Sequence, residues 1–327
     1  MKIGAILYGD FGDIAAMFAL SNIIKDTEIV LITSPVYKKF AERYGSFLEI
    51  IEFSTKNIDK TIKKVNTIDI DVLCDLHSSS YSNPDFIYWL NFVDINKIRI
   101  TRSRANRLDK SNLSKIEQLN DRIISTKIHN VENYLNKLDI NMDLKKDSLK
   151  IKPTIEDKAY SINIKKEFGN KKVIGLIPNS RFPHKEWNHK NWYELAFKLN
   201  SKNYLTAILC AKYEIGKMEL LAENTSSIIL SSATPEGHIK NVLSMDTLVS
   251  IDTGLKHIAG YLDYPIVTLY GHSSPEIWGT LSSSEYMIKG DLECIPCNNP
   301  FFCKFENSSC VDSISVEKVL EKIISIG

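Results

Sequence analysis

The stretch that decides the fold is "DTLVSIDTGLKHIAGYLDYPIVTLYG", residues 246–271. Two apolar runs, 246–252 and 265–271, have the length of buried strands, and they flank a segment that begins a helix. A strand, a helix and a second strand in this order predict a βαβ unit, in which the strands are parallel and the helix covers one face of the sheet. The stretch therefore predicts an α/β protein.

The same alternation extends outward along the chain. Helical spacing is found at 14–24 and 191–200, and further short apolar runs predict strands at 2–7, 28–34, 47–53, 68–77, 98–101, 171–177, 205–211 and 226–232. Between the two groups of strands, residues from about 105 to 165 are rich in Asn, Lys and Asp, and Pro153 lies in "KIKPTIEDK" (150–158), which we interpret as an interdomain linker. We therefore predict two Rossmann-like, doubly wound domains, 1–155 and 156–327.

Composition narrows the class of protein. The chain has 327 residues, 43% hydrophobic and 25% charged, which is enough for two globular cores. Its 41 basic and 40 acidic residues leave a net charge of +1, so we expect no nucleic-acid partner held by bulk electrostatics. The first apolar run is too short for a secretory signal, and no run approaches about 18 apolar residues. We expect a soluble, cytoplasmic protein.

Ligands of doubly wound sheets bind beyond the carboxyl ends of the strands, so the segments after each predicted strand are the candidates. After the first strand, Gly9 and Gly12 leave room for a close approach of the backbone, and Asp13 starts the helix. Asp10 is interpreted as a turn or capping residue. We expect an acceptor molecule to approach this turn.

Two segments in the second half suit a phosphate or diphosphate. Asp252, Thr253 and Gly254 lead into a helix whose first N–H groups attract anions, although Asp252 and Thr253 could instead cap that helix with no ligand involved. In the loop after residue 177, Lys185 could neutralise charge on a leaving diphosphate, and the alternative is a solvated basic loop. Trp187, in the same loop, is expected to pack where the next helix starts.

These segments together resemble glycosyltransferase family 9, the ADP-heptose:lipopolysaccharide heptosyltransferases of the GT-B fold, in which two domains face a central cleft. The matching stretches, in chain order, are "MKIGAILYGDFGDIAA" (1–16), "DLHSSSYS" (75–82), "IGLIPNSRFPHKEW" (174–187), the D-[ST]-G-x-x-H-x-A signature within 248–279, and a cysteine-rich tail at 294–319. The resemblance runs along most of the chain, and five stretches in the right order make it specific.

The resemblance implies an inverting transfer of a heptose or related sugar from an ADP-sugar to a glycan acceptor, lipopolysaccharide or lipooligosaccharide core, without a catalytic divalent metal. It assigns Asp13 as the general base and Lys185 as the contact to the donor phosphates. The remaining donor-binding residues that it implies are Ser180, Glu214, Asp252, Thr253, Gly254 and His257. An inverting transfer needs one base and stabilisation of the departing ADP, and these residues supply both.

The acceptor side departs from the family pattern. Gly9, Gly12 and His77 are expected to line the acceptor cleft, but the stretch 75–84 has none of the basic residues that the family offers to a phosphorylated core. His77 could equally pack in the interior. The arginines of "ITRSRANR", Arg102, Arg104 and Arg107, either contact the acceptor or form a solvated basic face. A protein acceptor and a peripheral association with the cytoplasmic face of the inner membrane therefore stay open.

Four cysteines cluster near the end of the chain, at Cys294, Cys297, Cys303 and Cys310. Four thiolates at the spacing C-x₂-C-x₅-C-x₆-C can hold a structural Zn or Fe ion. Unmodified thiols and two disulfides are the alternatives, and a reducing cytoplasm argues against the disulfides. Cys74 and Cys210 lie apart in apolar or small-residue runs and are expected to be buried, reduced thiols.

Two other functions compete with sugar transfer. A nucleotide-sugar epimerase has the same two-domain architecture, but it relies on several carboxylates and on a different histidine pattern. A catalytically silent nucleotide-sugar-binding or interaction protein is the rival outside the enzymes. The retention of Asp13 argues against silence, because a protein that only binds the donor has no need of a base.

Overall fold

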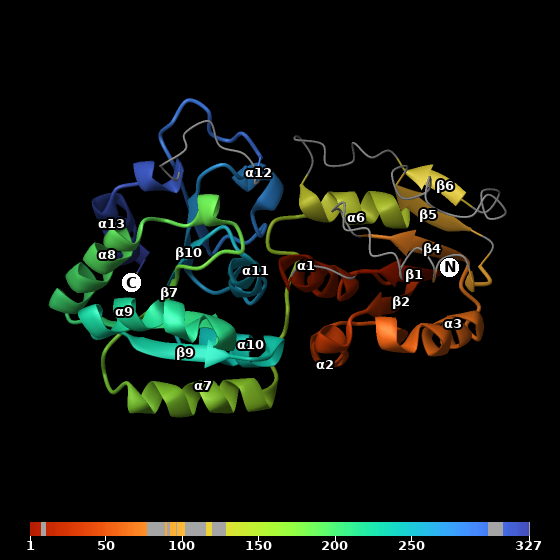
Figure 1. The fold of residues 1–327 in the computed structure, drawn as a ribbon, viewed down its shortest axis with the longest axis horizontal. Coiled ribbons are helices and arrows are strands. Elements are labelled where there is room, and N and C mark those ends of the chain that lie inside the picture. The colour runs from red at the N-terminus through yellow and green to blue at the C-terminus, as the bar shows by residue number, and fades with distance from the viewer. Residues whose placement is uncertain are drawn as a thin grey trace. The chain divides into compact units, whose positions relative to one another are not determined.

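The computed structural model describes residues 1–7, 11–76, 89, 92–95, 97–101, 116–119, 129–299 and 310–326. The chain divides into two compact units, Met1–Leu144 and Lys145–Gly327, and the described residues of each contain one six-stranded sheet (Figure 1). Every pair of neighbouring strands in both sheets is parallel. The α/β fold class predicted from the alternation of strands and helices is confirmed.

The described part of the first unit holds six strands in the order β3-β2-β1-β4-β5-β6. Their bounds are β1 Lys2–Ile6, β2 Glu28–Thr33, β3 Glu49–Glu52, β4 Val72–Asp75, β5 Ile98–Thr101 and β6 Ile116–Leu119. Its described helices are α1 Phe11–Ser21, α2 Pro35–Tyr44, η1 Thr55–Asn57, α3 Ile58–Asn66 and α6 Asn130–Leu138. The order of strands reverses between β1 and β4, which is where a doubly wound sheet binds its ligand.

The second unit repeats this topology with the order β12-β11-β10-β7-β8-β9. Its strands are β7 Val173–Ile177, β8 Leu205–Ala211, β9 Ile228–Ser232, β10 Thr247–Ile251, β11 Ile266–Tyr270 and β12 Glu285–Lys289. Its described helices are α7 Ile155–Glu167, η4 Pro183–Lys185, α8 His189–Ser201, η5 Lys212–Glu214, α9 Ile215–Thr225, α10 Pro235–Leu243, α11 Gly254–Tyr261, α12 Pro275–Trp278, η6 Cys310–Ser313 and α13 Val316–Ile326. Here the order reverses between β7 and β10.

The division between the units lies before the predicted boundary near residue 155. The segment 145–154 belongs to the second unit because its backbone is bound there: the Asp147 N–H donates to the Leu281 carbonyl at 2.7 Å, and the Ile151 N–H donates to the Tyr261 carbonyl at 2.7 Å. Thr154 then caps α7, which packs against α10 (Figure 1). The stretch interpreted as a linker therefore contains the start of a helix.

The central strands β7, β10 and β11 are buried along their whole length, as expected for a parallel sheet covered on both faces. Trp187 and Trp192 pack in this core with their rings edge to face and their centroids 5.2 Å apart, which confirms the packing role predicted for Trp187. None of the described helices is long and apolar enough to cross a membrane.

Candidate active site

The carboxyl ends of β7 and β10 bring two of the predicted segments together. Lys185 ends η4 in the loop after β7, and Asp252 directly follows β10. The Lys185 Nζ donates to Asp252 Oδ2 at 2.7 Å, although the residues are 67 positions apart. The lysine side chain is 18% exposed and the aspartate 5%. Lys185 is therefore paired with a buried carboxylate, and the alternative of a solvated basic loop is wrong for this residue.

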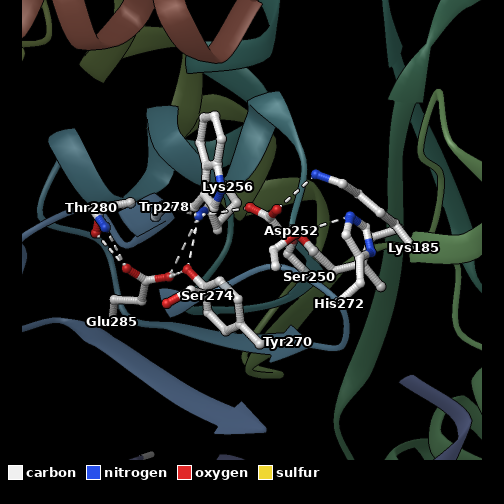
Figure 2. Close-up of polar contacts among 12 residues, drawn as sticks. Lys185, Ser250, Asp252, Lys256, Tyr270, His272, Ser274, Trp278, Thr280 and Glu285 are labelled. Atoms are coloured by element: carbon white, nitrogen blue, oxygen red, sulfur yellow. Dashed lines mark hydrogen bonds and ion pairs between the residues drawn. The ribbon is translucent and has the colours of Figure 1, made fainter. Parts of the chain in front are cut away.

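A second lysine contacts the other oxygen of the same carboxylate. Lys256 in α11 places its Nζ 3.0 Å from Asp252 Oδ1, and its side chain is completely buried. It also donates to the Tyr270 hydroxyl at 2.9 Å and to the Trp278 carbonyl oxygen at 2.6 Å (Figure 2). Lys256 was not predicted from the sequence, although its spacing of four residues from Asp252 at the start of a helical stretch was a usable signal.

The hydrogen bonds continue away from Asp252. The Tyr270 hydroxyl donates to Glu285 Oε1 at 2.8 Å, and Glu285 Oε2 accepts from both the backbone N–H and the hydroxyl of Thr280 at 2.7 and 2.8 Å. Glu285 lies on β12, so the network joins the switch point to the edge of the sheet (Figure 2). A buried polar network of this kind rigidifies the groups that it connects.

The two ammonium groups determine the protonation of Asp252. Burial alone would raise the pKa of this carboxyl, but Lys185, Lys256 and His257 together hold its pKa well below the usual range. At the other end of the network, burial and the Glu285 carboxylate raise the pKa of Tyr270 well above its ordinary value. Asp252 is therefore ionised and Tyr270 is a neutral phenol at physiological pH.

The start of α11 carries the predicted donor-binding signature. Thr253 is the N-cap residue with an extended backbone, and its side chain makes no capping hydrogen bond. The capping alternative is thus not realised by the Thr253 hydroxyl. Gly254 is the first helical residue, and His257 is buried in the first turns. The helix begins beside Asp252 and Lys185, where its first N–H groups favour an anion.

Two further polar side chains belong to this region. His272 follows β11 and is buried, and burial, the Lys185 ammonium and His184 outweigh the Asp252 carboxylate and lower the pKa of His272 to about 4. It is therefore neutral at physiological pH. The side-chain nitrogen of Asn179, in the loop after β7, is buried with no hydrogen-bond partner in the described part of the chain. The loop that contains Asn179 was expected to stabilise a leaving diphosphate, whereas His272 was not predicted as a site residue.

Ser180 and Glu214 make local contacts. The Ser180 hydroxyl accepts a hydrogen bond from the Phe182 N–H at 3.1 Å, which shapes the loop before η4. The Glu214 carboxylate accepts from the Ala211 N–H at 2.8 Å and so closes the start of η5. Their predicted contacts to the donor stay predictions.

In the first unit, Asp13 lies in the first turn of α1 and accepts a hydrogen bond of 2.6 Å from the hydroxyl of Tyr134. Tyr134 is buried on α6, which packs against α1 and β4. One turn further on, the buried Lys137 donates to the Leu76 carbonyl at 3.0 Å, just after β4. These contacts lie at the carboxyl ends of β1 and β4. Tyr134 could not be found from the sequence, because it is 121 residues from Asp13.

The rest of the predicted acceptor region is only partly described. Gly12 is the second residue of α1, and therefore helical rather than part of the preceding turn. Gly9, Asp10 and His77 lie outside the described residues, as do Arg102, Arg104 and Arg107. The expected acceptor contacts of these residues stay predictions.

Three of the four tail cysteines are described. Cys310 is buried at the start of η6, Cys294 is half-buried and Cys297 is exposed, whereas Cys303 lies outside the described residues. Where side chains are described, no three His, Cys, Asp or Glu residues group as a metal site. The four-cysteine metal site stays a prediction. Cys74 and Cys210 are buried as expected, and burial and Glu214 raise the pKa of Cys210 to about 11.

Comparison with solved structures shows the fold. A glycosyl transferase family 9 protein from Veillonella parvula superposes with a TM-score of 0.78 and 16% identity, covering 99% of this chain and 96% of that one. The ADP-heptose lps heptosyltransferase II of E. coli superposes with a TM-score of 0.72 and 20% identity, covering 100% and 98%. The predicted GT-B architecture of two doubly wound units is thereby confirmed.

Comparison with curated sequences points to the same family. Lipopolysaccharide heptosyltransferase 2 of Escherichia coli (strain K12) is 28% identical over 141 residues, which are 41% of this chain and 40% of that protein. The matched part thus spans about two fifths of the relative. The family model "Glycosyltransferase family 9 (heptosyltransferase)" matches residues 99–302, which is more than half of the sequence. The chain therefore belongs to glycosyltransferase family 9.

Proposed function

We propose that the protein is an inverting glycosyltransferase that moves a heptose or related sugar from an ADP-sugar to a glycan acceptor, lipopolysaccharide or lipooligosaccharide core. The observation that carries this proposal is the contact of 2.7 Å between Lys185 and Asp252. Two family motifs that were separately expected to bind the donor meet at the switch point of one sheet, where doubly wound proteins bind nucleotides. Family membership and the names of the relatives support the same function.

The second unit would hold the donor. The diphosphate would lie against the Lys185 ammonium and the first N–H groups of α11 at Thr253 and Gly254, because both favour negative charge. When the sugar leaves, these groups stabilise the charge that develops on ADP, so no catalytic divalent cation is needed. Neutral His272 and the Asn179 amide offer further hydrogen bonds there. Ser180, Glu214 and His257 complete the donor-binding set that the family resemblance implies.

The first unit would supply the base. The acceptor hydroxyl gives its proton to the Asp13 carboxylate, and its oxygen forms a bond to the anomeric carbon on the face opposite ADP. The bond from that carbon to the diphosphate breaks, and ADP leaves with the electron pair, so the configuration at the anomeric carbon is inverted. The hydrogen bond from Tyr134 orients Asp13 for this step.

The test measures ADP release and ADP binding on the same proteins. The wild-type chain, incubated with ADP-heptose and a heptose-free core oligosaccharide, should release ADP. Asp13→Asn should lower kcat by about a hundredfold or more, the usual contribution of a general base, and should leave the calorimetric Kd for ADP unchanged. The control is Asp59→Asn, because Asp59 is also an acidic residue in the first turn of a helix of the same unit, but exposed.

Other outcomes of these measurements would contradict or change parts of the proposal. Loss of ADP binding in Asp13→Asn contradicts the assignment of the base. Tight ADP binding without release from any of several nucleotide sugars and acceptors would favour the silent binder. Release only with a polypeptide acceptor would replace the core oligosaccharide with a protein substrate. A cytoplasmic reaction, at the inner membrane or away from it, stays a prediction from the sequence.

A further inference from the structure

The most unusual group in the second unit is the ammonium of Lys256. Its side chain has no exposed surface, and lysine is almost never fully buried unless it is paired. The three protons of an ammonium have three acceptors here, namely Asp252 Oδ1, the Tyr270 hydroxyl and the Trp278 carbonyl. All three are fixed by the fold, so the Lys256 ammonium is held in one position (Figure 2).

Lys185 contacts the same carboxylate in a different way. It reaches Asp252 from η4, in the loop after β7, rather than from α11, and its side chain is partly exposed. In Figure 2 Lys185 and Lys256 lie on opposite sides of the Asp252 carboxylate. Asp252 therefore has one buried cation and one cation that solvent or a ligand can reach.

The cluster contains two buried carboxylates and two lysines, so the charges of these four side chains balance when both lysines are counted. Asp252 and Glu285 are buried carboxylates, and Lys256 lies 3.0 Å from the first and 3.9 Å from the second. Lys185 supplies the remaining positive charge. A buried carboxylate that loses all its cationic partners is strongly destabilised. If Lys185 left Asp252, Lys256 would stay behind as a cationic partner of that carboxylate.

We propose that Lys256 is a positioning residue, the permanent counter-ion of Asp252, which leaves Lys185 able to exchange between Asp252 and the diphosphate of the donor. This inference rests on the proposed function, because it takes the diphosphate as the ligand of Lys185. Without Lys256, the Asp252 carboxylate would hold Lys185 as its main counter-ion. Each diphosphate would then have to break that ion pair before it binds.

The experiment measures the Kd for ADP by calorimetry in a double-mutant cycle of Lys256→Met and Asp252→Asn. Lys256→Met should weaken ADP binding by about tenfold, a typical coupling between charges in contact. In the Asp252→Asn background the same change should alter the Kd by less than about twofold, since no carboxylate remains to retain Lys185. Lys256→Arg keeps the charge and should restore part of the affinity. With the full reaction, Lys256→Met should raise the donor KM more than it lowers kcat.

The matched control is Lys150→Met. It breaks another Lys–Asp pair, to Asp263 at 2.8 Å just beyond the opposite end of α11, and should leave the Kd for ADP unchanged. If Lys256→Met does not fold, the double variant Lys256→Met/Glu285→Gln is compared with Glu285→Gln alone. In the double variant, Asp252 is the buried carboxylate that remains and Lys185 is the lysine that remains, so their charges still balance.

The outcomes separate this proposal from the proposed function. No ADP binding by the wild-type chain contradicts the proposed function itself. Normal binding that is weakened by Lys185→Met but not by Lys256→Met overturns only the role of Lys256. If Lys256→Met costs the same affinity with and without the Asp252→Asn change, the role of Lys256 is also overturned, since the effect would then not pass through Asp252.

Discussion

Replacing His272 with glutamine should remove a pH-dependent loss of stability from the second unit. Burial, Lys185 and His184 lower the pKa of His272 from its ordinary value of 6.5 to about 4, against the opposing effect of Asp252. Between these two values the unfolded chain binds a proton that the folded chain does not bind. The free energy of unfolding therefore rises with pH in this window and falls on acidification.

The size of the effect follows from the two pKa values. A shift of this size lowers the free energy of unfolding by about 3 kcal/mol once the pH has fallen to about 4. Between pH 7 and pH 5 the unfolded state becomes almost fully protonated at this ring while the folded state does not, so about 2 kcal/mol of stability is lost. His272→Gln cannot take up this proton. It should therefore lose about 2 kcal/mol less than the wild type over the same interval.

Urea unfolding followed by tryptophan fluorescence can measure this difference. Three of the four tryptophans, Trp187, Trp192 and Trp278, belong to the second unit, so the signal reports mainly its transition. His238→Gln is a parallel test, because burial lowers the pKa of His238 to about 4 as well. The exposed His189→Gln is the control, since that ring meets solvent in both states. A difference between His272→Gln and wild type that is constant from pH 5 to pH 7 would refute the reasoning.

Three other changes test separate parts of the structure. Tyr134→Phe should lower kcat by about tenfold or more and leave the ADP affinity unchanged, because a hydrogen bond to a charged group is lost. Steady-state kinetics measure this, with the exposed Tyr160→Phe as the control. Trp187→Phe removes a hydrogen bond to the Ile314 carbonyl and part of a buried ring, so calorimetry should show a loss of about 2 kcal/mol. Cys294→Ser should abolish a structural metal found by elemental analysis of the wild type, whereas Cys74→Ser should not; a metal-free wild type would contradict the four-cysteine site.

The sequence predicted all the central strands of the two sheets and two of the four described edge strands, β3 and β9, whose segments 47–53 and 226–232 contain apolar runs. Continuous apolar runs such as VIGLI in β7 and IVTLY in β11 are visible because a parallel strand is covered on both faces. The two strands that were missed, β6 and β12, are edge strands with polar sequences, IEQL and EYMIK. An edge strand has one neighbour and needs less apolar surface, so an edge strand with a polar sequence does not stand out from a loop.

The sequence predicted which segments form the site, but not how their side chains contact one another. The expectation that the loop after β7 and the turn after β10 bind the ligand depends only on their position directly after a strand, and the apolar runs show where the strands end. That Lys185 contacts Asp252 directly could not be read from the sequence, because it depends on the path of the loop through η4. Tyr270 and Glu285 were missed for a similar reason, since β11 and β12 become neighbours only in the folded sheet.

Each unit places a carboxylate near the switch point of its sheet, Asp13 after β1 and Asp252 after β10, and the two carboxylates have different partners. Asp252 is held by two ammonium groups that keep its pKa well below the usual range, so it is a poor proton acceptor at neutral pH. Asp13 accepts a hydrogen bond of 2.6 Å from the Tyr134 hydroxyl. A base must bind the proton that it removes. The partners of Asp252 suit a fixed negative charge that orients Lys185, and this supports the proposal that Asp13, not Asp252, is the base.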